Sequence, residues 1–263
     1  MSRGSALEAL SLMREPPTYS IAIVCEADAD RRTASTLSDR VLRGAVEWIV
    51  PETIDLLRRY RGLHDEDPYL KWTNMKEMAR RQHIVAHGFV GGEPRKPDAA
   101  MAERALRLLA TVESPPSAVI LTRDMDRESQ RREGFEQARS AEGGWPFEVV
   151  IGVADTKREC WILAGYEPRD DAEQKLLARE CQELGFDPRS GAEQLTASEK
   201  GARRDAKRVL DALTRGDQAR EEACIEDTPL TVLEQRGAMT GLAAYLLEIG
   251  ERLVPIFEPT ARP

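Results

Sequence analysis

The stretch SAVILTRDMDRES, residues 117–129, decides the fold, because an apolar run in it ends abruptly in two carboxylates. Ser117–Thr122 has the length and the β-branched content of a buried strand. Asp124 and Asp126 follow it. Side chains at positions i and i+2 of a strand point to the same side of the sheet. We therefore expect both aspartates to face one site.

The rest of the first 165 residues alternates between strand and helix patterns. A second apolar strand, Tyr19–Cys25, also leads into acidic residues, here Glu26 and Asp30. Further strands are predicted over 46–50 and 147–153, and a third over 83–92 together with a glycine-rich turn. Helices are predicted over 31–42, 51–60, 100–112, 126–141 and 157–165. Residues 61–82 are predicted to form a loop with a short helix. This alternation predicts an α/β fold with a mostly parallel sheet flanked by helices.

Strand patterns stop after residue 165, and only helical patterns follow. These helices are predicted over residues 170–184, 198–213 and 242–253. The chain is therefore divided into an N-terminal segment, a strand-containing domain and a C-terminal helical appendage, at residues 1–18, 19–166 and 167–263. The first segment carries an amphipathic helix pattern at Ala6–Met13. The wide apolar stripe of Thr240–Phe257 is expected to pack on the main domain or to dock a partner protein.

Bulk composition limits the classes of protein that this chain can represent. Of its 263 residues, 41% are hydrophobic and 32% charged, and no apolar run approaches the roughly 18 residues of a membrane helix. The first residues lack a secretory signal pattern, so we expect a cytoplasmic protein with no membrane partner. Four scattered cysteines without a CxxC pair argue against a disulfide framework or a zinc cage. The net charge of −8 implies that any nucleic-acid contact is local or assisted by a partner.

The acidic residues at two strand ends predict a metal site. In open α/β sheets, ligands bind beyond the carboxyl ends of the strands. Carboxylates gathered there repel one another, and a divalent cation removes that repulsion. Oxygen ligands suit Mg²⁺ or Mn²⁺, and the expected ligands are Glu26, Asp30, Asp124 and Asp126. The alternative is that the two aspartates only cap the next helix.

Other metal and phosphate motifs do not match. An EF-hand loop starting at Asp124 requires glycine and glutamate where Ser129 and Phe135 stand. Haloacid-dehalogenase phosphatases usually carry their DxD on the first strand, whereas this DxD follows a late one. The chain has no GxxxxGK[ST] phosphate loop and no HExxH motif. His83 and His87 are interpreted as ordinary strand-end residues.

The ordered set of motifs resembles the Toprim fold, which topoisomerases, primases, recombination factors and a family of nucleases share. The matching pieces are IVCEADAD, a glycine-containing turn after a middle strand, and ILTRDMD. Within that fold the chain is similar to stand-alone bacterial Toprim-like proteins of the DUF4276 and RloB type. Those proteins often read E-G-x-x-D where this chain has Ala27, and E-x-W-L-L where it has Glu159 and Trp161. The resemblance covers residues 19–166.

The resemblance implies metal-dependent phosphodiester chemistry, as in a nuclease of a bacterial defence or repair system. Asp124 and Asp126 would bind Mg²⁺, and Glu26 would bind metal or act as a general base. Glu159 is a further catalytic candidate, and Asp30 a further ligand. Two metals are proposed for the nuclease branch. Trp161 is expected to belong to the core.

Basic residues near the acidic motifs are candidates for binding substrate phosphates. They are Arg123, Arg127, Arg131, Arg132, Lys157 and Arg158, with Lys157 counted among the catalytic candidates. A second basic run, Lys200–Arg208, is interpreted as a solvated helix face. The expected partners are DNA or RNA and an ATPase or other defence protein. Two alternatives remain: a non-catalytic Toprim-like regulatory or toxin subunit, and a small phosphotransfer enzyme.

Overall fold

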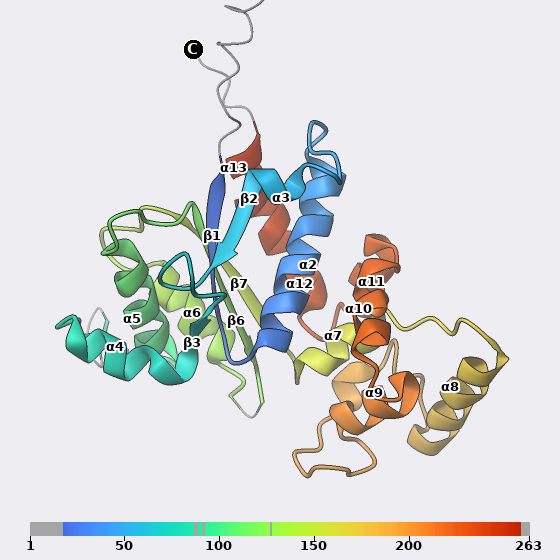
Figure 1. Cartoon of the computed structure of the whole chain (residues 1–263). Coiled ribbons are helices and arrows are strands. Elements are labelled where there is room, and N and C mark those ends of the chain that lie inside the picture. The colour runs from blue at the N-terminus through green and yellow to red at the C-terminus, as the bar shows by residue number, and fades with distance from the viewer. Residues whose placement is uncertain (1–17, 87–88, 91–92, 127, 259–263) are drawn as a thin grey trace, which may run out of the picture.

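The computed structural model describes residues 18–86, 89–90, 93–126 and 128–258 of the chain. The predicted helix at Ala6–Met13 lies outside the described residues, as do His87 and Arg127. Figure 1 shows a central sheet with helices on both faces and a group of helices from the C-terminal region at one side.

The sheet has five strands, and every pair within it is parallel. The strand order is β2-β1-β6-β7, and β3 pairs with the end of β1 beyond β2. The strands are β1 (Tyr19–Cys25), β2 (Arg58–Arg61), β3 (Leu70–Lys71), β6 (Ala118–Asp124) and β7 (Glu148–Ala154). The predicted α/β class, with a mostly parallel sheet flanked by helices and a helical C-terminal region, is confirmed.

Both faces of the sheet are buried, which explains why β1 and β6 are continuous apolar runs. In β1, Ile21 and Ile23 belong to one hydrophobic core cluster, whereas Ala22 and Val24 belong to a second. The two clusters lie on opposite faces because successive strand side chains alternate. A parallel sheet covered on both sides leaves its charged groups to the strand ends.

Each face has its own set of helices (Figure 1). The first cluster includes residues of α2 (Asp28–Ala45), α7 (Arg158–Ala164) and α12 (Leu242–Glu248). The second includes residues of α4 (Met75–Arg81), α5 (Ala99–Ala110) and α6 (Arg131–Arg139). The short connecting elements are α3 (Ile54–Leu57), the 3₁₀ turns η1 (Trp72–Asn74) and η2 (Ala192–Gln194), and the hairpin of β4 (Phe89–Val90) with β5 (Glu93–Pro94).

The C-terminal helices share the core of the first sheet face. Leu210, Cys224 and Leu233 lie in the same hydrophobic cluster as Ile162 of α7. The helices are α8 (Asp171–Leu184), α9 (Ala206–Thr214), α10 (Gln218–Glu226), α11 (Leu230–Arg236), α12, the π-helical turn η3 (Ile249–Leu253) and α13 (Val254–Phe257). The predicted packing of the Thr240–Phe257 stripe on the main domain is therefore confirmed.

Helix α12 covers the free edge of β7. Glu248 is buried there and accepts the backbone N–H of Ile151 and the guanidinium of Arg139, at 3.3 and 2.7 Å. The buried Tyr245 hydroxyl donates to the carbonyl of Ala34 on α2. An edge strand normally leaves backbone groups unpaired, so this side-chain contact protects the sheet from pairing with another chain.

Several predicted elements are wrong. The predicted strand 46–50 is a turn, in which Val46 and Ile49 are buried but Trp48 and Val50 are exposed. A strand there would have needed a partner, and β1 already has β2 and β3 on that side. Within the predicted helix 51–60, only α3 is helical, and the residues from Arg58 onward belong to strand β2. Of the predicted strand 83–92, the structure forms only the β4–β5 hairpin, outside the main sheet.

Helix boundaries differ as well. The predicted helix 126–141 begins at Arg131, because Asp126 adopts a left-handed φ of 50° that no helix accommodates. The predicted helix 198–213 begins at Ala206, where Asp205 caps it by accepting the N–H of Lys207. Helices α10 and α11 had no prediction, since short helices with weak apolar periodicity give little signal.

Gly241 fixes the approach of α12 to the sheet. Its φ is +79°, and a Cβ there would overlap the carbonyl oxygen of Val153. Gly201 has a similar φ of +81° but open space around it. We expect Gly201→Ala to cost about 1–2 kcal/mol from backbone strain alone. Gly241→Ala should cost at least about 2 kcal/mol more, from the added steric clash.

Urea denaturation followed by circular dichroism measures both costs. Equal losses in the two variants would show that the contact between Gly241 and β7 is not tight.

Candidate functional site

The carboxyl ends of β1 and β6 bring the two predicted acidic motifs to one edge of the sheet. The strands are neighbours, with Val24 opposite Leu121. Glu26 directly follows β1, and Asp124 is the last residue of β6. Because the strands are parallel, their carboxyl ends and the acidic residues that follow share an edge.

Asp124 is the most constrained of these carboxylates. Its Oδ1 accepts the backbone N–H of Arg158, the first residue of α7, at 2.7 Å. Burial raises the pKa of Asp124 to about 8, and the negative charges of Glu159, Asp30 and Asp126 add to the rise. The hydrogen bond from Arg158 opposes it only in part. Asp124 therefore sits where a proton or a cation is favoured over a bare negative charge.

Asp30 and Glu159 lie close enough to Asp124 to interact with it electrostatically. Asp30 Oδ2 accepts the N–H of Ala27 at 2.9 Å, which closes the first turn of α2. Burial raises the pKa of Asp30, while that hydrogen bond and the charge of Arg158 lower it. Glu159, in the first turn of α7, is only 15% exposed. Of the predicted site residues, these two lie beside Asp124 as a carboxylate group.

Glu26 has a different partner from the one expected. The Nε of Arg123 lies 2.7 Å from its Oε1, and the same guanidinium reaches Asp98 at 2.9 Å. Glu26 remains close enough to raise the pKa of Asp30. The expected grouping of Glu26 with Asp124 and Asp126 around one ion is not found among the described residues, and Glu26 is instead paired with Arg123 of β6.

Asp126 also departs from the prediction. β6 ends at Asp124, so Asp126 lies in a turn to which the alternation of strand side chains does not apply. Its N–H donates to the carbonyl of Thr156, and its side chain is 51% exposed. Arg131 lies 3.5 Å from it. The two aspartates therefore face different surroundings, since Asp124 is partly buried and Asp126 is open to solvent.

Lys157 points away from the acidic group. Its Nζ is 3.4 Å from Oδ1 of Asp205, the residue that caps α9. Residue 157 precedes α7, and from there its side chain reaches the residue that caps α9 in the C-terminal region. Arg158, one residue further on, is the cation that serves the site.

Further contacts at this site come from two arginines, Arg131 and Arg158, and from two acidic residues, Asp98 and Glu221. Arg131 is buried, pairs with Asp98 and donates to the backbone carbonyl of Asp124. The guanidinium of Arg158 lies 3.8 Å from Asp30 and 3.5 Å from Glu221 of α10. Asp98 and Glu221 gave no motif in the sequence. Pro97–Asp98 looked only like a helix start, and α10 was not predicted.

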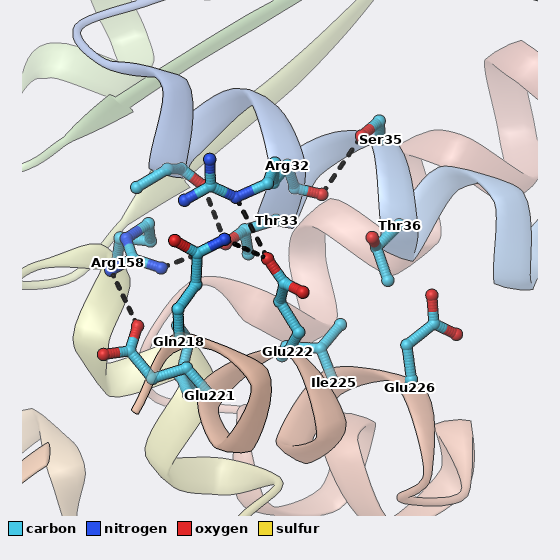
Figure 2. A pocket seen from close by; sticks show the side chains of 12 residues that line it. Arg32, Thr33, Ser35, Thr36, Arg158, Gln218, Glu221, Glu222, Ile225 and Glu226 are labelled. Carbon is cyan, nitrogen blue, oxygen red and sulfur yellow. Dashed lines mark hydrogen bonds and ion pairs between the residues drawn. The ribbon is translucent and has the colours of Figure 1, made fainter. Parts of the chain in front are cut away.

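A cavity of about 200 Å³ opens beside this group, between α2, α7 and α10. Figure 2 shows Arg158 and Arg32 facing the glutamates of α10 across it. Arg158 reaches Glu221, and Arg32 reaches Glu222 at 3.2 Å. Arg158 thus belongs both to the cavity wall and to the acidic group, so the C-terminal helices form one side of the site.

The acidic residues match a hard cation in chemistry but not in arrangement. Carboxylate oxygens are the donors that Mg²⁺ and Mn²⁺ prefer. Within the described ranges, however, no three His, Cys, Asp or Glu side chains are grouped so that they could hold one ion. Arg123 holds Glu26, Asp126 is exposed, and Arg158 pairs with Asp30 and Glu159. The fit is therefore partial, and the chain's own arginines supply the positive charge.

Comparisons with protein-family models, with curated proteins and with solved structures found no match to this chain. The helices in the described parts of the chain are all too short or too polar to span a membrane. The site's chemistry must therefore be argued from its own residues.

The raised pKa of Asp124 predicts that the stability of the folded chain depends on pH. The folded chain keeps this proton up to about pH 8, whereas an unfolded aspartate releases it near about pH 4. The folded state is therefore favoured below about pH 4, and this contribution is lost as the pH rises to about 8. We expect Asp124→Asn to raise the unfolding temperature at pH 8 to 9 and to flatten its decline with pH.

Asp171→Asn is the matched control, because it removes one exposed carboxylate at the start of α8. Differential scanning calorimetry between pH 5 and 9 compares the two variants with the unmodified chain. An Asp124→Asn curve parallel to that of the unmodified chain would contradict the raised pKa.

Proposed function

We propose that this chain hydrolyses phosphodiester bonds of nucleic acid with the help of Mg²⁺ or Mn²⁺ at Asp124. The observation that supports the proposal is the partly buried Asp124 carboxyl, whose pKa is raised to about 8 beside Asp30 and Glu159 at the carboxyl edge of the sheet. Strongly shifted carboxylates at such an edge are typical of active sites. The resemblance to Toprim proteins adds to this argument.

The residues that would hold the cation are Asp124, Asp30 and Glu159, with Glu26 after it leaves Arg123. The described side chains are not grouped around one ion beforehand, so Asp30 and Glu159 would have to leave Arg158 and move toward Asp124. A bound divalent ion would activate water and stabilise developing negative charge on the phosphate oxygens. Residues of the chain would orient the ligand, accept the proton and bind the phosphates. The backbone N–H of Arg158 orients Asp124. The Glu26 carboxylate is the proposed proton acceptor, and Arg123 and Arg131 would offer their guanidinium groups to phosphates.

A second function has its own support. Apart from Asp124, the described acidic residues of the site each lie within ion-pairing distance of an arginine. A site that neutralises its own charges suits a non-catalytic regulatory or toxin subunit, which binds partners without turnover. A phosphotransfer enzyme acting on small esters is the third candidate. A cytoplasmic setting in a defence or repair system, with an ATPase partner, is proposed for all three.

One assay separates these functions. The purified chain is mixed with 1 to 10 mM Mg²⁺ or Mn²⁺, amounts on the order of those that weak carboxylate sites require, and offered plasmid, single-stranded DNA, RNA and a small phosphate ester. We expect cleavage of nucleic acid that EDTA abolishes. Asp124→Asn should reduce it by at least about 100-fold, since it removes a proposed ligand. Asp171→Asn should leave the rate unchanged.

Metal binding is measured separately by thermal shift at pH 8. A stabilisation by Mn²⁺ that Asp124→Asn loses, without cleavage of any substrate, would support the non-catalytic subunit. Hydrolysis of the ester alone would support the phosphotransfer enzyme. Cleavage that survives Asp124→Asn would rule out the proposed site.

A further inference from the structure

A second cavity, of about 450 Å³, lies between α4 and α5 and is lined mainly by basic and apolar side chains. It is distinct from the cavity beside Arg158, with which it shares no residue. Its lining consists of Lys76, Ala79, Arg80, His83, Ile84, Val85 and Arg104. The described residues that line it include no carboxylate, although the chain as a whole has a net charge of −8.

The charges of this cavity are available to a ligand. Lys76 and Arg104 form no ion pair or hydrogen bond with any residue that the structure describes. Arg80 pairs with Glu77, but both side chains are largely exposed, so that pair contributes little and exchanges readily. Residues 70–107 hold eight Lys or Arg against four Asp or Glu, a net charge of +4. This basic surface is therefore local, as a nucleic-acid contact on an acidic protein must be.

The cavity also has apolar walls, which a site that binds only phosphate would not need. Ala79 is buried at its floor, and Ile84 and Val85 add apolar walls, with Val85 62% exposed. An apolar hollow rimmed by cations fits a nucleotide whose base is out of the helical stack, with its phosphates on the rim. A base inside a duplex is paired and stacked, so it cannot enter such a hollow.

Both helices of the cavity start at the sheet edge that carries the acidic site. α4 follows Trp72, whose Nε1 donates to the carbonyl of Thr122 at the end of β6. α5 follows Asp98, which joins Arg123 and Arg131. Arg104 lies six positions further on, and a rise of about 1.5 Å per residue places it about 9 Å along α5. The cavity is therefore built on two helices that begin at the same end of the sheet as Asp124.

We propose that the cavity between α4 and α5 docks single-stranded nucleic acid, with one base on Ile84 and Val85 and the flanking phosphates on Lys76, Arg80 and Arg104. This inference rests on the proposed function, for which it names the form of the substrate and the surface that holds it.

Fluorescence anisotropy tests the proposal without catalysis. A fluorescein-labelled single strand of thymidylates is titrated with the full chain in EDTA at low salt. We expect Lys76→Glu with Arg104→Glu to weaken binding at least tenfold. The salt dependence of log K should become shallower by about 1 to 2, because two phosphate contacts are lost. Lys200→Glu with Arg203→Glu makes the same charge change on an exposed basic run elsewhere and should alter binding far less.

Circular dichroism checks that each variant is folded, and a labelled duplex of the same length serves as competitor. Absence of binding to the unmodified chain, equal losses in the two double variants, or equal affinity for the duplex would each overturn the proposal. Binding that depends on the cavity but comes without cleavage would refute the nuclease and leave the docking surface standing.

Discussion

The structure depends on a parallel sheet that is buried on both faces. Because β1 and β6 have apolar neighbours on either side, charged groups that belong to these strands can lie only at their ends. Glu26 and Asp124 are therefore driven to the same edge, and the helices that follow the strands must carry the groups that solvate them. The first N–H of α7 and the first turn of α2 fill that role.

Arginines determine how this acidic edge is arranged. Arg123, Arg131 and Arg158 reach it from β6, α6 and α7, and each contacts two or more acidic or carbonyl groups. The planar guanidinium suits such shared contacts. Among the described carboxylates at this edge, Asp124 alone forms no ion pair with an arginine, and burial together with the charges of Glu159, Asp30 and Asp126 raises its pKa to about 8. Arginine charges therefore offset the carboxylate charges at this edge, except at Asp124.

The C-terminal helices belong to the same structural unit as the sheet. Glu248 and Tyr245 fasten α12 to β7 and α2, and Gly241 allows the close approach. Glu221 of α10 reaches Arg158, and Asp205 draws Lys157 away from the acidic group. The acidic group around Asp124 is therefore bordered by α10 through Arg158, and α5 begins beside it at Asp98, which pairs with Arg123 and Arg131. The region after residue 166 shapes the site rather than simply following it.

The sequence by itself determined the strands Tyr19–Cys25 and Ala118–Asp124 closely, since continuous β-branched runs bounded by charge allow little else. It also indicated that acidic residues gather at one sheet edge, because parallel strands end on the same side. Only the tertiary structure decided which carboxylates meet. Glu26 pairs with Arg123, Asp126 leaves the strand in a left-handed turn, and Arg158 is held by Glu221 from a distant helix. Side-chain pairing depends on long-range packing, which the local periodicity of a sequence does not contain.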